Sequence, residues 1–326
     1  MHFIVTGGAG FVGSHVTEQL LSEGHSVTVV DNLTKGRLQN LPIKHHRLKF
    51  LQKDLCTCKS EDFTTPIHGI AHLAATPSVM ESWLQPLEVH HNNLSLMIST
   101  IQLCQTLNIP KLVFASSAAV YGKQSHLPIL EDQATCPISP YGLQKLVSEQ
   151  YASLFAKKIG FSFVALRIFN VFGPRQLPNS PYSGVISVFV KAMQQNLPIT
   201  IYGDGTQTRD FIYIKDVAIA CSKALTMTQA KSDRLICNLG TGKTTSIIQL
   251  IDILKACFPE YKSEIRFASP RPGDIQHSQA DISKLSSHLI TPQWSVQEGI
   301  HLLLKSCLPS RYKLKVSGAG FRSVPS

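Results

Sequence analysis

The stretch that decides the fold class is residues 3–13, which read Phe3-Ile4-Val5-Thr6-Gly7-Gly8-Ala9-Gly10-Phe11-Val12-Gly13. Its first four residues are a short apolar, β-branched run, which predicts a strand. Apolar residues then recur at helical spacing up to Leu21, and a second β-branched run covers residues 26–31. Strand, glycine turn, helix and strand in this order predict the first unit of an α/β fold, a doubly wound parallel sheet that binds a nucleotide.

Three glycines, Gly7, Gly10 and Gly13, have the spacing G-x-x-G-x-x-G. They allow a tight turn, a close approach of the backbone to a pyrophosphate and close packing of helix on strand. The spacing differs from the better-known G-x-G-x-x-G, and an ordinary glycine turn is the alternative interpretation. The strand, the helix and an acidic residue all fall where the nucleotide-binding motif needs them, which favours the functional interpretation.

That acidic residue is Asp31, at the end of the second predicted strand. Its carboxylate can accept hydrogen bonds from the ribose hydroxyls of NAD and would repel the 2′-phosphate of NADP. We therefore predict NAD as the cofactor, although Lys35 and Arg37 lie just beyond and could favour a phosphate.

Further strands are predicted at residues 48–51, 69–75, 111–115 and 161–167, and helices at about 86–107 and from residue 140 onward. Strands that alternate with helices indicate a parallel sheet. Small residues after the fourth strand, such as Ala74, suit the approach of a cofactor, and His72 is predicted to be a structural hydrogen-bonding residue. Two serines, Ser116 and Ser117, end the fifth strand and are either site residues or caps.

Beyond residue 170 the chain is rich in prolines and glycines, and its helices are predicted to be short. We predict a nucleotide-binding domain at 1–170 and a smaller, irregular substrate-binding region at 171–308 that partly returns to the sheet. A basic tail at 309–326 is predicted to be disordered.

The composition of the 326 residues, with 43% hydrophobic and 16% charged residues, is that of an ordinary globular enzyme. Neither a membrane-spanning run nor a signal peptide is expected, so the predicted location is the cytoplasm. Six cysteines stand singly and suit buried reduced thiols, whereas Cys56 and Cys58 lack a second pair at zinc spacing, so no metal is predicted. The net charge of +10 is dispersed or lies in the tail, which argues against nucleic acid and is consistent with an anionic small-molecule substrate.

A tyrosine and a lysine open the helix that begins near Ser139. Tyr141 and Lys145 are four residues apart and therefore neighbours on the helix surface. A nearby cation lowers the pKa of a phenol, so this pair is a candidate general base with its activator. The spacing alone occurs in many helices by chance, and the glycine turn is what favours a catalytic role. Apolar residues at helical spacing predict the buried face of this helix: Leu143, Leu146, Val147, Tyr151, Leu154 and Phe155.

An ordered set of motifs then identifies a family. The set is TGGAGFVG, HLAA, SSAAVYG, YGLQK, RIFNVFGPRQ, YGDGTQTRDFIYIKDVA and RPGD, and it runs from about residue 2 to about residue 305. With these motifs the chain resembles an extended short-chain dehydrogenase/reductase of the NAD-dependent sugar-nucleotide epimerase/dehydratase family, most closely the UDP-hexose 4-epimerases. The resemblance implies a Rossmann fold and an enzyme.

The resemblance also implies roles for individual residues. Around the cofactor, the resemblance implies that the pyrophosphate is bound by Gly7, Gly10, Phe11 and Val12. The adenosine ribose would be bound by Asp31 and Asn32, and the adenine edge would contact Asp54 and Leu55. In the catalytic group Tyr141 would be the base, Lys145 would bind the nicotinamide ribose, and Ser117 would bond the reacting sugar oxygen. For the substrate, Asn170 would contact the sugar nucleotide, and Arg209 and Arg271 would clamp the diphosphate, with a surface ion pair as the alternative for each arginine.

The implied reaction is a reversible inversion at C4 of a UDP-hexose, by transient oxidation with tightly bound NAD+, in a homodimer formed through the helices at 86–107 and from Tyr141. Ala118 and Ala119 stand where dehydratases have an acidic pair, which argues against loss of water and also against decarboxylation. Ser278 lies at the position that flanks the 2-substituent of the sugar, so N-acetyl sugars are plausible substrates. Leu96 replaces a common glycine, which weakens a ligand role for Asn93. The rival hypotheses are an oxidoreductase that releases NADH and a non-catalytic nucleotide-sensing module.

Overall fold

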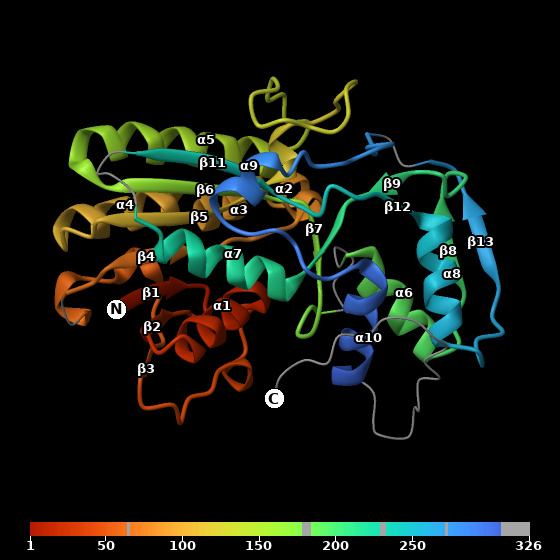
Figure 1. Cartoon of the computed structure of the whole chain (residues 1–326), viewed down its shortest axis with the longest axis horizontal. Helices are drawn as coiled ribbons and strands as arrows, with labels where there is room; N and C mark the ends of the chain where they lie inside the picture. Colours follow the sequence, from red (N-terminus) through yellow and green to blue (C-terminus); the bar gives the residue numbers. More distant parts are fainter. Residues whose placement is uncertain (64–65, 178–183, 229–232, 271–272, 308–326) are drawn as a thin grey trace.

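The fold is built on a central parallel sheet, whose strands follow one below another in Figure 1, from β11 near the top to β3 near the bottom. The computed structural model describes residues 1–63, 66–177, 184–228, 233–270 and 273–307. Within them the strand order is β11-β6-β5-β4-β1-β2-β3, and each neighbouring pair is parallel. The strands of this sheet are β1 (His2–Thr6), β2 (Ser26–Val30), β3 (Leu48–Leu51), β4 (Gly69–His72), β5 (Lys111–Ser117), β6 (Ser162–Ile168) and β11 (Arg234–Leu239).

Helices cover both faces of the sheet. On one face lie α1 (Phe11–Ser22) and α7 (Ile214–Thr226), which pack against each other, and on the other lie α4 (Leu96–Thr106) and α5 (Pro140–Phe155). Side chains alternate between the two faces along a strand. In β1, accordingly, Phe3 and Val5 join the core under α1 and α7, while Ile4 joins the core under α4 and α5. The doubly wound fold predicted from residues 3–31 is confirmed.

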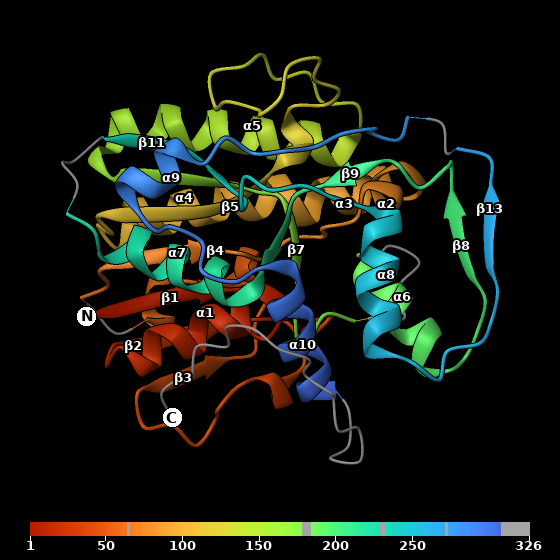
Figure 2. The same ribbon diagram turned by 45° about the vertical axis from the view of Figure 1, so that its right-hand side comes forward.

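A second group of elements lies beside the carboxyl ends of the strands, on the right of Figure 2. It contains α6 (Val185–Gln194), β8 (Ile199–Tyr202), α8 (Ile247–Cys257) and β13 (Ile265–Ala268), with β8 and β13 in a parallel pair. Two further small pairs join it to the sheet, β7 (Asn170–Phe172) with β10 (Phe211–Tyr213), and β9 (Thr208–Arg209) with β12 (Thr245–Ser246). The last helices described are α9 (Ser283–His288) and α10 (Val296–Cys307).

The prediction of short helices beyond residue 170 is wrong. Helices α7, α8 and α10 have 13, 11 and 12 residues, and α7 packs on the sheet itself. Prolines and glycines are concentrated in the turns between these helices, and the apolar residues within each helix have ordinary amphipathic spacing. The boundary at residue 170 stays a prediction, and the tail at 309–326 lies outside the described residues.

The predicted helix at 86–107 is one continuous stretch with an irregular centre. It consists of α3 (Pro86–His90), a π-helical turn (His91–Ser95) and α4, and the short α2 (Val79–Leu84) precedes it. Asn93 is buried in the π-helical turn, where its Oδ1 accepts from the Thr76 N–H at 2.8 Å and its Nδ2 donates to Gln144 Oε1 at 2.8 Å. Asn93 therefore joins the segment after β4 to α5.

The predicted buried face of α5 is wrong. Leu143, Tyr151 and Leu154 are 52%, 38% and 69% exposed. The face that packs on the sheet carries mainly polar side chains, and its buried residues are Tyr141, Gly142, Gln144, Lys145, Ser148, Glu149, Ala152 and Ser153. Polar side chains can be buried when they are hydrogen-bonded. The other three predicted residues, Leu146, Val147 and Phe155, are partly buried, so helical spacing predicted the helix correctly but not the residues of its most buried face.

Other expectations about surface and cysteines have mixed outcomes. Cys104, Cys221 and Cys237 are buried free thiols, but Cys136 is exposed, so the prediction of burial is wrong there. None of the helices in the described part of the chain is long and apolar enough to cross a bilayer. In the same part, no three histidine, cysteine or acidic side chains are grouped so that they could hold a metal ion.

Candidate active site

The turn between β1 and α1 is closely packed, and two of its glycines are required by geometry. Gly7 has a φ of +65°, and a Cβ there would lie 2.8 Å from the backbone nitrogen and Cα of Ala74. A Cβ on Gly13 would lie 2.1 Å from the Gly7 carbonyl oxygen. Because the cap residue of α1 is Gly10, no side chain bonds the first amides of this helix, at Phe11 and Val12. Free amides at a helix N-terminus form a binding site for an anion such as a pyrophosphate.

Four predicted adenosine-binding residues lie together at the ends of β2 and β3. The Asp31 carboxylate accepts from the Ala9 N–H at 2.9 Å and from the Leu33 N–H at 2.8 Å, so it fixes the glycine turn and its own loop. Each carboxylate oxygen has a further lone pair for a ribose hydroxyl. Asn32 donates to Asp54 at 3.1 Å, and Asp54 caps the turn that begins at Leu55. The Lys35 ammonium is paired with Glu81 at 2.6 Å.

His72 and Thr6 link β1, β4 and α4 beneath this groove. The Thr6 hydroxyl accepts from the N–H groups of Leu73 and Ala74, both at 3.2 Å, which fixes Ala74 against the glycine turn. His72 Nδ1 lies 3.0 Å from the Thr6 hydroxyl and 2.9 Å from the Thr100 hydroxyl. Burial lowers the pKa of His72 to about 3, so the ring is neutral at physiological pH. This histidine is the structural hydrogen-bonding residue that was predicted.

Ser117, Tyr141 and Lys145 come together where β5 ends and α5 begins. The Ser117 side chain is close enough to the Tyr141 hydroxyl to lower its pKa. The Tyr141 N–H also donates to the Ser82 hydroxyl at 3.1 Å, which holds the first turn of α5. One turn later the Lys145 ammonium lies 5.8 Å from the centre of the Tyr141 ring and donates to the Ala115 carbonyl at 2.8 Å.

The predicted direction of the tyrosine pKa is wrong for the chain alone. Burial raises the pKa of Tyr141, and the nearby Ser117 side chain opposes this only in part. Burial also lowers the pKa of Lys145 to about 7, because the ammonium loses its hydration. Lys145 donates to a carbonyl rather than to the phenol, and a lysine with this pKa is only partly charged near neutral pH. The four-residue spacing correctly predicted that the two side chains are neighbours. It gave no information about the desolvation of both groups, which determines the direction of their pKa shifts.

The predicted substrate residues are gathered around Asp210. This buried carboxylate accepts from the N–H groups of Thr241 at 2.8 Å, Gly242 at 2.9 Å and Ala280 at 3.1 Å. The backbone carbonyl of Asp210 accepts from the Asn170 N–H at 3.0 Å. Arg209 directly precedes Asp210, and the buried Ser278 lies two residues before Ala280. Asn170, Arg209 and Ser278 are therefore close in space, whereas Arg271 lies outside the described residues.

The Arg209 guanidinium donates to the Asp274 carboxylate at 2.8 Å and to the Thr208 carbonyl at 2.9 Å. Asp274 belongs to the RPGD turn, so two of the family motifs meet here. Arg209 thus makes the ion pair that was named as its alternative role.

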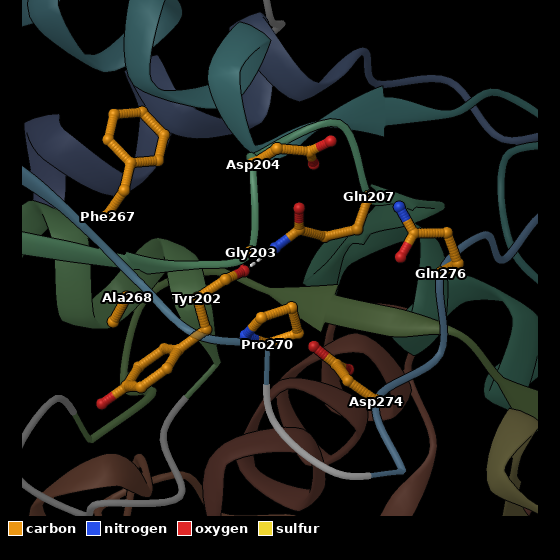
Figure 3. A pocket seen from close by; sticks show the side chains of 9 residues that line it. All are labelled: Tyr202, Gly203, Asp204, Gln207, Phe267, Ala268, Pro270, Asp274 and Gln276. Carbon is orange, nitrogen blue, oxygen red and sulfur yellow. Dashed lines mark hydrogen bonds between the residues drawn. The ribbon is translucent and has the colours of Figure 1, made fainter.

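A pocket of about 620 Å³ opens beside this ion pair, between the ends of β8 and β13. In Figure 3, Gln207, Asp274 and Gln276 lie on one side of the pocket, and Tyr202, Ala268 and Phe267 on the other. Gln207 donates to the Tyr202 carbonyl at 2.7 Å. Sequence reasoning missed these residues. The RPGD motif was a signal for Asp274, but the pairing of β8 with β13 had none.

Comparison with known proteins agrees with this geometry. The model of the NAD dependent epimerase/dehydratase family matches residues 3–240. The chain belongs to this family.

Its relatives include 4-epimerases. A UDP-glucose 4-epimerase of Bacillus subtilis is 32% identical over 92% of this chain and 94% of its own length. The structure of UDP-N-acetylglucosamine 4-epimerase from Methanobrevibacter ruminantium M1, in complex with UDP-N-acetylmuramic acid, has 37% identity and a TM-score of 0.88 over 94% of this chain and 97% of that one. The UDP-glucose 4-epimerase of Thermotoga maritima with UDP-glucose has 32% identity and a TM-score of 0.86 over 94% and 98%.

NAD, the cofactor of this family, suits the groove described above. The first amides of α1 carry no side-chain cap and suit a pyrophosphate, and Asp31 favours free ribose hydroxyls over a 2′-phosphate. With Lys35 held by Glu81, one of the two basic residues that favoured NADP is already paired. The chain is an NAD-dependent enzyme, as the sequence predicted.

Proposed function

We propose that the chain catalyses the reversible inversion at C4 of a UDP-hexose, by transient oxidation with tightly bound NAD+. The observation that carries the proposal is the meeting of Tyr141, Ser117 and Lys145 at the end of β5, beside the groove that begins at the glycine turn. Proximity supplies much of the rate, because the cofactor stays bound while the sugar reacts.

Each of the three side chains has a distinct task. Tyr141 removes the proton from the C4 hydroxyl and returns it, and Ser117 bonds the same oxygen and orients it. Lys145 binds the nicotinamide ribose and supplies a positive charge that favours the phenolate. When bound, NAD+ accepts a hydride from C4 and gives it back. Inversion requires the sugar to present its opposite face, so the sugar must be held loosely and the nucleotide firmly.

The firm hold is assigned to the region around Asp210. Arg209 and Arg271 would clamp the diphosphate, and Asn170 would contact the sugar nucleotide. We assign the pocket between β8 and β13 to the nucleoside, because it adjoins the Arg209–Asp274 pair and combines exposed aromatic rings with hydrogen-bonding side chains. In this division residues 1–170 hold NAD and supply Ser117, Tyr141 and Asn170 to the sugar nucleotide, and residues 171–308 provide the remaining contacts with the substrate.

Loss of water and decarboxylation are disfavoured by the residues that follow Ser117. Ala118 and Ala119 have no acidic or basic group, and they form a short 3₁₀ turn.

The experiment that tests the proposal is incubation of the purified chain with UDP-glucose, followed by product analysis and by absorbance of NADH. UDP-galactose without net NADH is expected. Stoichiometric NADH would instead support an oxidoreductase.

A small side chain at position 278 is the basis for a second substrate pair. Ser278 is buried near Arg209, so a larger residue there would reduce the space beside the sugar. We expect turnover of UDP-GlcNAc and UDP-GalNAc as well as the unsubstituted pair, and Ser278→Tyr should reduce turnover of the N-acetyl pair at least about tenfold more than that of UDP-glucose. Complete inertness of the unmodified chain toward UDP-GlcNAc would refute this assignment.

A homodimer in the cytoplasm is the proposed state of the protein. The support is a group of apolar side chains on the neighbouring helices α2, α3 and α5 that the described residues leave exposed, namely Trp83, Leu84, Leu87, Leu143 and Leu154. Leu87 is 86% exposed, and contiguous apolar patches of this kind mark interaction sites. The free cysteines are consistent with a reducing compartment.

A further inference from the structure

Three consecutive residues at the end of β5 hold three successive turns of α5. The Ser117 side chain lies near the Tyr141 hydroxyl, the Ala115 carbonyl accepts from Lys145, and the Ser116 hydroxyl donates to the Glu149 carboxylate. Tyr141, Lys145 and Glu149 are spaced by four residues and so lie along one face of the helix. The third contact has no part in the mechanism above, and Glu149 is buried.

The Glu149 carboxylate is also bound from the neighbouring strand. Arg167 Nε donates to one carboxylate oxygen at 3.0 Å and Nη2 to the other at 2.8 Å. Ser116 and Arg167 are direct partners in the register of β5 and β6, so both reach the same point on α5. Arg167 is held in turn by the Tyr121 ring at 4.8 Å and the Glu131 carbonyl at 3.1 Å.

A buried ion pair by itself need not stabilise a protein, because desolvation offsets the attraction and apolar residues often do as well. This pair differs in its position, one helical turn from Lys145. In the described residues, the titratable or charged groups around that ammonium are Tyr141 and Glu149 on α5, the neutral His72 on β4, and Arg167 on β6 behind Glu149. Glu149 is the acidic group among them.

We propose that Glu149 is a positioning residue for catalysis, which with Ser116 and Arg167 sets the register of α5 on β5 and keeps a negative charge one turn from the Lys145 ammonium. This rests on the proposed function, because it assumes that Lys145 acts as a cation beside NAD+ and Tyr141. Burial lowers the pKa of Lys145 to about 7, and the charge of Glu149 is the influence that opposes this fall. Without it, a smaller fraction of Lys145 would be charged at working pH.

The test compares Glu149→Gln, Arg167→Gln and the double variant with the wild type. Selective 13C labelling of lysine gives the titration midpoint of Lys145 by NMR, with its signal assigned from Lys145→Met. The pH profile of kcat is recorded in parallel. Glu149→Gln should move the midpoints of the Lys145 titration and of the kcat profile to lower pH. At a pH above the midpoint, each unit of this shift lowers the charged fraction of Lys145 about tenfold. Arg167→Gln keeps the carboxylate and should not move them downward.

A purely structural ion pair predicts a different pattern, because either single variant would then break it equally. Equal movement in Glu149→Gln and Arg167→Gln, or no movement in Glu149→Gln, would overturn the proposal. If a single variant does not fold, the double variant, which leaves no charge unpaired, should still show the lowered Lys145 midpoint. The titration midpoint of Lys145 is measured by NMR and does not depend on turnover. A wild type without epimerase activity would therefore refute the proposed function, and the effect of Glu149 on Lys145 would still be tested.

Discussion

At the scale of single residues, the proposed reaction depends most on Tyr141. Replacement by Phe removes the hydroxyl that exchanges the proton with the substrate but keeps the ring and its packing. We expect kcat to fall by at least about 10²-fold, the range of general acid–base catalysis. NAD should remain bound, because the glycine turn and Asp31 are unchanged.

Measurement of turnover, with mass spectrometry of the bound nucleotide, checks this prediction. Ser117→Ala is the matched comparison and should lower kcat less, since it removes only an orienting hydrogen bond. Turnover near the wild-type level in Tyr141→Phe would show that another group is the base.

Gly13 supports a second prediction at this scale. A Cβ in Gly13→Ala would lie 2.1 Å from the Gly7 carbonyl oxygen, so the turn must shift. We expect about 1–3 kcal/mol of lost stability and loss of NAD from the purified protein. Chemical denaturation and nucleotide content are the measurements, and a variant that retains a full complement of NAD would contradict the structure of this turn.

At the scale of elements, His72 joins β1, β4 and α4, and its protonation should control acid stability. The unfolded histidine has a pKa near 6.5, whereas burial lowers the pKa of the folded one to about 3. The unfolded state therefore binds the extra proton, and the free energy of unfolding should decrease as the pH falls from about 6.5 toward 3. The effect is at most a few kcal/mol, at about 1.4 kcal/mol per unit of pKa.

Denaturant unfolding at several pH values measures that slope. His72→Gln offers an acceptor to the same threonines and does not titrate, so its stability should depend less on pH in this range. An identical slope in the variant and the wild type would mean that other groups govern acid unfolding.

The elements also indicate what sequence could and could not predict. The strands of the first half were predictable, because β-branched runs alternate with helical patterns and the sheet is buried on both faces. Helix α5 was predictable as a helix but not in orientation, since its buried side chains are polar and bonded to β5 and β6. Hydrophobic spacing carries no information about such partners. The pairing of β8 with β13, and hence the pocket, joins segments more than sixty residues apart and has no local signal.

Candidate site residues divide in the same way. Asp31, Tyr141 and Lys145 follow from spacing and chemistry, whereas Asn170, Arg209 and Ser278 entered only through resemblance to a family. Asp210, which gathers the latter group, and Glu149, which supports Lys145, were not identified. Both act through buried hydrogen bonds to distant segments, which a sequence does not display.

At the scale of the whole molecule, the uncovered apolar surface of α2, α3 and α5 predicts a dimer. Leu154→Glu places a charge on this surface, at a side chain that is 69% exposed, and should give a monomer with little change in monomer stability. Analytical ultracentrifugation measures the change. Leu197→Glu, at a residue 50% exposed and away from this surface, is the control and should remain dimeric. Loss of the dimer in both variants, or in neither, would contradict the assignment.

The central claim is that hydrogen leaves C4 of the sugar and returns to it while the cofactor stays bound. It is based on the fold, the groove and the three converging side chains. The most direct measurement is incubation of the purified chain, without added NAD, with UDP-glucose that carries deuterium at C4. The proposed mechanism predicts UDP-galactose that retains the deuterium at C4, with no build-up of NADH. No conversion, or UDP-galactose that has lost its deuterium, would contradict it.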